Sequence, residues 1–312
     1  MAPSLTSHRP GLAITLKLSA IFLFSMMSAL IKASSAEVPP GEAVFFRSFF
    51  AIPVILVWIA SRGELRSGLV AQKPMVHVWR GIIGTSAMGL TFAGLGLLPL
   101  PEVTAIGYAT PMMTLILAAI MLGERIRLIR ISAVVIGLVG VLIMLWPRLG
   151  GGGGMQDAAS LGALLILGAT MLRALVQIHI RKMVETERTS AIVFYFSSTA
   201  AGLALLTLPF GWVVPSWHTL TLLVLAGLVG GTAQILVTSS YRFGPASMLA
   251  PYEYAAMLFA ILIGYVWFGE VPTLIMLLGA ALVIAGNVLV IWREHQLGLE
   301  RGKARAVSDP KA

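Results

Sequence analysis

The sequence predicts an all-α integral membrane protein in which ten transmembrane helices form two inverted five-helix repeats around a central cavity. Three observations lead to this fold class. Hydrophobic residues make up 58% of the 312 residues and charged residues only 11%, against about 45–50% and roughly 25% in an average soluble domain. The apolar residues form runs long enough to cross a bilayer, and the basic residues gather in alternate loops. The second half of the chain also repeats sequence features of the first half.

The composition excludes several other classes of protein. A soluble globule of this size could not cover its surface with so few charged residues. The mean hydropathy of +0.91 excludes intrinsic disorder, which requires low hydrophobicity. The chain contains no cysteine, so a disulfide framework and a thiolate metal site are both excluded.

The apolar runs define the expected helices in order. A transmembrane helix needs about 20 apolar residues, because each residue adds about 1.5 Å across roughly 30 Å of hydrocarbon. Runs that meet this requirement lie at 12–32, 42–61, 76–98, 102–122, 128–146, 159–180, 189–209, 217–241, 246–268 and 272–292. The first run is too long for an ordinary signal peptide, and Lys32 precedes its only plausible cleavage point. We therefore expect a retained helix and not a cleaved signal.

The basic residues indicate the orientation of these helices. With the N-terminus in the cytoplasm, about 18 of the 22 Lys and Arg residues fall on the cytoplasmic side. This group includes Lys17 and Arg80, whereas Lys32 and Arg148 fall outside. An even number of spans with both termini cytoplasmic is therefore expected. The net charge of +9 reports this orientation, and no nucleic-acid partner is needed to explain it.

A glycine run divides the chain into two halves. We expect a first half at 1–146, a glycine-rich linker at 147–158, a second half at 159–292 and a basic cytoplasmic tail at 293–312. At a shift of about 146 residues, Pro99, Tyr108 and Gly123-Glu124 align with Pro245, Tyr254 and Gly269-Glu270. Each half has an odd number of spans, so the second half must be inverted in the membrane. Inverted repeats are typical of secondary transporters, while a duplicated channel or membrane enzyme is the alternative.

These motifs resemble those of the drug/metabolite transporter superfamily, in the group of EamA-type bacterial metabolite exporters. Pro111 precedes Glu124 by thirteen residues, as in the pattern Pro…Leu-Gly-Glu of that family, and Arg47 matches its second-span arginine. The second half departs from the pattern, with Met257 in place of the proline and Phe268 in place of the leucine. The resemblance covers residues 12–292 and implies a secondary transporter with a cavity between its two halves. Tyr108 followed by Pro111 is similar to the aromatic-amino-acid exporter branch, although Thr110 replaces the aromatic residue of that branch.

Three ionisable residues within the spans are the first candidates for a site, because charges in the membrane usually face protein or water. Arg173, with Gln177 one turn later, could hold an anionic group in a central cavity. Glu253 could bind a substrate ammonium or relay a proton, or it could form an ion pair with an arginine such as Arg173. Arg47 could attract a carboxylate, but a structural role is favoured.

Polar and aromatic residues on the spans that line the cavity in this superfamily complete the candidate set. Hydroxyl, amide, thioether and ring groups suit an apolar substrate body with a polar head. The cavity candidates are Ser86, Met88, Thr91, Tyr108, Thr110, Arg173, Gln177, Gln234, Thr238, Tyr252, Glu253 and Tyr254. Pro111 and Pro251 interrupt backbone hydrogen bonding in mid-membrane and, with Arg47, form a structural or gating group. For any single residue, core packing is the alternative.

The sequence argues against enzymatic and ATP-driven activity. Its five histidines form no HExxH pair, and the run from Gly150 to Gly154 lacks the Gly-Lys-Ser/Thr ending of a phosphate-binding loop. We expect no cofactor, metal or ATP. The leading hypothesis is an inner-membrane exporter of amino acids, aromatic ones first, driven by the substrate gradient or by protons. An organophosphate, nucleotide-sugar or drug exchanger and a membrane enzyme acting on lipid intermediates are the alternatives.

Overall fold

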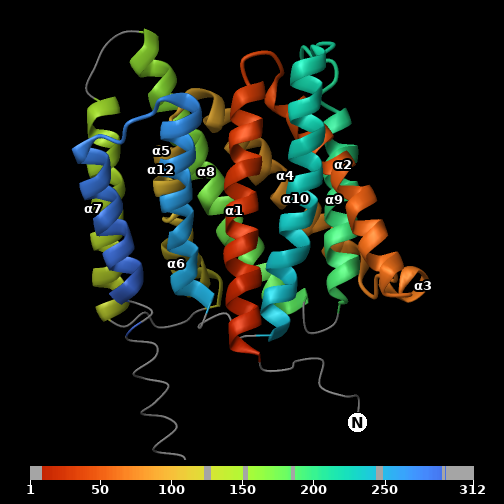
Figure 1. Cartoon of the computed structure of the whole chain (residues 1–312). Helices are drawn as coiled ribbons and strands as arrows, with labels where there is room; N and C mark the ends of the chain where they lie inside the picture. Colours follow the sequence, from red (N-terminus) through yellow and green to blue (C-terminus); the bar gives the residue numbers. More distant parts are fainter. Residues whose placement is uncertain are drawn as a thin grey trace, which may run out of the picture.

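The computed structural model describes residues 9–122, 128–149, 154–183, 187–243, 249–289 and 292, and within these ranges its regular structure is entirely helical. The first half contains α1 (Pro10–Ser34), α2 (Pro40–Ser61), α3 (Leu65–Gly68), α4 (Pro74–Leu97), α5 (Leu100–Gly107), α6 (Thr110–Leu122) and α7 (Leu128–Leu149). The second half contains α8 (Gly154–Met183), α9 (Thr189–Leu205), α10 (Trp217–Phe243), η1 (Ala250–Tyr254), α12 (Ala255–Phe268) and a final helix over Leu274–Leu289. Side by side, these helices form an all-α bundle (Figure 1).

The helices correspond in order to the ten predicted spans. Pro10, Pro40 and Pro74 begin α1, α2 and α4, because proline lacks the N–H that the first turn leaves unpaired. Within the part of the chain that the structure describes, four helices are long and apolar enough to cross a membrane by length and composition. Large hydrophobic side chains remain exposed on the bundle, such as Val57, Leu164 and Trp146, as expected for contact with lipid. The fold class predicted from the sequence is therefore confirmed.

Two spans differ from the continuous helices that were predicted. The fourth span is divided into α5 and α6 by a break at Tyr108 and Ala109. The ninth span begins with the 3₁₀ turn η1 before it continues as α12. Both breaks lie beside a proline, Pro111 or Pro251, which removes a backbone donor. Near the glycine run, α7 extends to Leu149 and α8 begins at Gly154.

The two halves are packed into each other. The most extensive helix–helix contacts join α1 to α10, α4 to α8, and α2 to both α9 and α10, and α1 lies between the flanking groups of helices in Figure 1. At the edge of the bundle, a Cβ atom on Gly140 of α7 would lie 2.6 Å from the carbonyl oxygen of Gly279 in the last helix. Only glycine permits this close approach. Any rocking of one half against the other must therefore take place along these contacts.

Candidate functional site

The break in the fourth span exposes two backbone carbonyls inside the bundle. Because Pro111 cannot donate to the carbonyl four residues earlier, Gly107 O accepts a hydrogen bond from Thr110 Oγ1 at 2.7 Å. Tyr108 O accepts one from Asn287 Nδ2 at 3.0 Å. Asn287 is buried and was not among the predicted site residues. An amide in an otherwise apolar final span was the signal that could have revealed it.

Two tyrosines from equivalent positions of the repeat meet at this break. The Tyr108 hydroxyl donates to Tyr254 O at 3.1 Å, and the two rings lie edge to face with centroids 5.4 Å apart. Residues related by a two-fold operation contact each other only near its axis. The Tyr108–Tyr254 contact therefore marks the centre of the arrangement of the two halves.

Arg173 lies beside this centre on α8. Its Nη2 donates to Thr91 Oγ1 on α4 at 2.6 Å, and its Nη1 is 3.6 Å from the position of a Cβ on Gly107. Among the described residues, no carboxylate lies within salt-bridge distance of Arg173. Arg173 thus contacts Thr91 and lies beside Gly107, the residue before Tyr108. Its remaining guanidinium N–H groups are the kind of donor that an anionic group accepts.

Glu253 pairs with a lysine that the sequence reasoning had placed elsewhere. Lys17 Nζ lies 2.8 Å from Glu253 Oε1, and the side chains are 4% and 45% exposed. The alternative in which Glu253 would pair with Arg173 is thus wrong. Lys17 had been counted among the cytoplasmic charges, but it lies within α1 and is buried, because it stands well inside an apolar run.

A second ion pair joins α1 to the second half near the other end of the helix. Lys32 Nζ lies 3.0 Å from Glu270 Oε1 and donates to Leu95 O and Leu98 O at 3.2 and 2.5 Å. Glu270 Oε2 accepts the N–H of Leu100 at 2.8 Å, which satisfies a free donor at the start of α5. The preceding Gly269 ends α12 with φ +65°, a left-handed conformation that favours glycine. The Gly-Glu motif therefore ends one helix and caps another.

Among the described residues, the other predicted site residues form no hydrogen bond with Arg173 or Tyr108. Met88 packs against the main hydrophobic core, Ser86 is exposed, and Thr238 donates back to Gln234 O within its own helix at 2.6 Å. Tyr252 lies in η1 beside Glu253 and is half-buried. The side chains of Gln177 and Pro251 fall outside the described residues.

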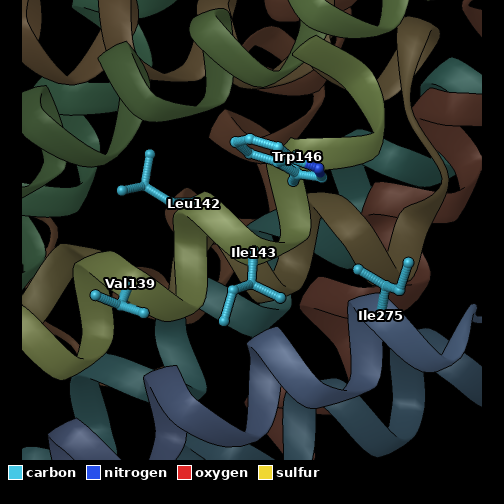
Figure 2. Close-up of a pocket in the computed structure, with 5 residues that line it drawn as sticks. All are labelled: Val139, Leu142, Ile143, Trp146 and Ile275. Carbon is cyan, nitrogen blue, oxygen red and sulfur yellow. The ribbon is translucent and has the colours of Figure 1, made fainter. Parts of the chain in front are cut away.

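Arg47 is buried on α2, away from this group. A pocket of about 230 Å³ lies between α7 and the last helix. Figure 2 shows its five lining residues, Val139, Leu142, Ile143, Trp146 and Ile275. They are apolar, four of them are exposed on the outer surface, and none is a predicted site residue. This hollow therefore suits a lipid chain better than a polar metabolite.

Two carboxylates outside the spans hold loops against helix ends. The hydroxyl of Thr219 and the N–H and hydroxyl of Ser216 donate to Glu37, and these bonds lower the pKa of its carboxyl group. Burial by itself would raise the pKa of Glu187, but the N–H groups of Gln72 and Lys73 and the ring of His77 stabilise its carboxylate. Its pKa therefore lies below the usual value.

Comparison with known proteins places this geometry in a family. The model of the EamA-like transporter family matches residues 11–146 and 160–292. An S-adenosylmethionine uptake transporter of Rickettsia prowazekii is 28% identical over 280 residues, which cover 88% of this chain and 92% of the relative. A pseudopaline exporter of Pseudomonas aeruginosa is 29% identical over 288 residues, 89% of this chain and 93% of the relative. A riboflavin transporter of Rhizobium johnstonii is 27% identical over 263 residues, 82% of each chain.

A solved structure supports the fold as well. A crystal structure of a protein aligns with a TM-score of 0.64 at 24% identity and covers 91% of this chain and 98% of its own. The relatives are transporters and not enzymes, which confirms the prediction of a transporter and the prediction that the protein is not an enzyme. The names of these relatives do not favour aromatic amino acids as substrates. Because one family model matches almost the whole length, the chain belongs to the EamA-like transporter family, whose members are multi-pass membrane proteins that carry small metabolites.

Proposed function

We propose that this protein exports small metabolites with an α-amino acid head group across the inner membrane by alternating access. The observation that carries the proposal is the group of unlike charges around the Tyr108–Tyr254 contact. Arg173 on α8 offers guanidinium donors, and Glu253 in η1 offers a carboxylate that is 45% exposed. A carboxylate and an ammonium on one substrate need such a pair of partners.

The contacts between these residues form a continuous path. Arg173 lies against Gly107, the next residue Tyr108 reaches the backbone of Glu253 and Tyr254, and Glu253 reaches Lys17. The tyrosine rings offer apolar faces for the body of the substrate. This arrangement supports amino acids and their derivatives as substrates, and S-adenosylmethionine, which names one relative's function, is itself a derivative of methionine.

The two ion pairs of α1 support a mechanism for alternating access. Lys17 and Lys32 are about 22 Å apart along the helix, and each binds a carboxylate of the second half, Glu253 or Glu270. Opening the site to one side requires the corresponding pair to separate, while the other pair keeps the opposite side closed. In this mechanism residues 1–146 and 159–292 rock against each other. The sorting of the basic residues supports an orientation with both termini in the cytoplasm.

The experiment that tests the proposal is counterflow in proteoliposomes. Vesicles loaded with an unlabelled amino acid should accumulate labelled phenylalanine or methionine, and Arg173→Met should abolish the uptake because the carboxylate loses its partner. Arg62→Gln is the matched control, since Arg62 is exposed at the end of α2, where its guanidinium carbon lies 4.6 Å from the centroid of the Trp58 ring. Absence of exchange for every amino acid and amino-acid derivative would overturn the proposed substrate class.

Proton coupling is tested in the same vesicles. If Glu253 carries the proton, Glu253→Gln should weaken exchange, because the substrate ammonium loses its carboxylate partner, and should remove the pH dependence of the counterflow that remains. An unchanged pH dependence in this variant would assign the driving force to the substrate gradient alone.

A further inference from the structure

Two arginines are buried together between α2, α4 and α9, away from the centre described above. Arg47 on α2 is 3% exposed and Arg80 on α4 is 5% exposed. Their guanidinium carbons lie 5.9 and 4.1 Å from the centroid of the same ring, that of Phe196 on α9. From the sequence, Arg47 was expected to be structural and Arg80 to lie among the cytoplasmic charges. The structure instead groups them inside the bundle.

These arginines have hydrogen-bonding groups that the protein does not satisfy. Within the described residues, the Nε and Nη1 atoms of both arginines are buried without a hydrogen-bond partner. Two hydroxyl groups on the same helices, those of Ser48 and Thr85, are also buried and unpartnered. Buried polar groups are normally paired, and buried charges especially so. Contact with the face of Phe196 offsets only part of this cost.

Two carboxylates on or near α2 and α4 are engaged elsewhere. Glu187 lies 3.2 Å from His77 Nε2 and accepts the N–H groups of Gln72 and Lys73 at the start of α4. Glu42, earlier on α2, accepts the N–H of Val213 at 3.1 Å. Neither is within salt-bridge distance of the two arginines. The positive charges of the two arginines are therefore not balanced by a carboxylate of the described residues. A bound anion would balance them.

We propose that Arg47 and Arg80 form a binding site for an oxyanion, the carboxylate or phosphate group of a small solute. Guanidinium groups match both anions because their N–H donors are arranged in a planar fork. The site is distinct from the centre, since Arg80 precedes Thr91, the partner of Arg173, by about 16 Å along α4. It does not depend on the proposed amino acid substrate.

The test measures how anions stabilise the full-length protein in detergent. Sodium phosphate and sodium acetate should raise the midpoint of thermal unfolding above its value in sodium chloride of equal ionic strength. Arg47→Met and Arg80→Met should each lose this response, whereas Arg62→Gln should retain it. Repeating the measurement in vesicles with and without phosphatidylglycerol distinguishes a lipid phosphate from a soluble anion as the source. Absence of stabilisation by every anion, or a full response in both methionine variants, would overturn the proposal.

A second measurement separates binding from folding. In chloride, Arg47→Met should unfold at the same temperature as the parent protein or above it, because the substitution removes an uncompensated buried charge. Equilibrium dialysis with labelled phosphate should show an apparent Kd weakened by about tenfold or more in Arg80→Met, with partial recovery in Arg80→Lys, which retains the charge. If both methionine variants unfold at lower temperature in chloride and still bind phosphate, the arginines act only as structural clamps. Arg173→Met should leave phosphate binding unchanged even where it abolishes counterflow.

Discussion

Replacing Glu270 with glutamine should open one end of the bundle. The substitution leaves the Lys32 ammonium with the carbonyls of Leu95 and Leu98 and the face of the Phe268 ring, 5.5 Å from its centroid, as partners. Removing one member of a buried ion pair costs about 3–5 kcal/mol, but these side chains retain 14% and 15% exposure, so water recovers part of that cost. A loss of about 2 kcal/mol from the closed state corresponds to a roughly 30-fold larger open population.

The assay uses the absence of cysteine from the sequence. A single cysteine at Val103, a buried residue on α5 one turn after the Leu100 N–H that Glu270 caps, should react slowly with a water-soluble maleimide. Adding Glu270→Gln should raise the rate by about 30-fold if opening limits the reaction. Glu64→Gln, at a partly exposed position before α3, is the matched control and should leave the rate unchanged.

Two outcomes would refute this reasoning. The first is an equal labelling rate with and without Glu270→Gln, which would mean that the ion pair does not hold this end closed. The second concerns stability. Glu270→Gln alone should lower the unfolding midpoint more than it does when combined with Lys32→Met, because the double variant leaves no unpaired ammonium. A double variant less stable than the single variant would show that the cost arises from packing instead of charge.

Two further predictions concern stability. Asn287→Leu leaves the carbonyl of Tyr108 without its donor and should lower the free energy of unfolding by about 1–3 kcal/mol. An unfolding midpoint equal to that of the parent protein would show that another donor replaces the amide. The lowered pKa of Glu187 stabilises the folded protein above the unfolded-state pKa, and this contribution is lost as pH falls through the lower folded-state pKa. On acidification below about pH 4.5, Glu187→Gln should therefore lose less stability than the parent protein. Thermal unfolding across a pH series would measure this difference. Identical pH profiles of the two proteins would contradict a stabilising role of the Glu187 carboxylate.

Much of the fold was predictable because membrane insertion imposes a strong local rule. Each span must satisfy its own backbone hydrogen bonds in a medium without water, so length and hydropathy define it. The breaks at Tyr108 and in η1 were partly predictable, since Pro111 and Pro251 mark them. The Tyr108–Tyr254 contact, by contrast, follows from the repeat only when the two halves are placed together.

The burial and the partners of the charged residues were not predictable from the sequence. Lys17 and Arg80 were counted with the cytoplasmic charges, yet both are buried, because a sorting rule for loops cannot report how deep a side chain lies within a helix. Glu253 was recognised as a candidate, but its partner is Lys17 and not Arg173, which had been considered as an alternative. Pairing depends on the rotation and depth of two helices at once, and the sequence of neither helix contains that information.

The sequence by itself thus determined the class of protein, the order and lengths of its spans and the presence of a repeat, because these depend on the affinity of each segment for the bilayer and on self-similarity along the chain. Only the tertiary structure decided that Lys17 meets Glu253, that Lys32 meets Glu270 and that Arg47 and Arg80 share the ring of Phe196. Charges buried in a bundle take the partners that helix packing brings within reach, and that packing is settled by contacts between segments far apart in the chain.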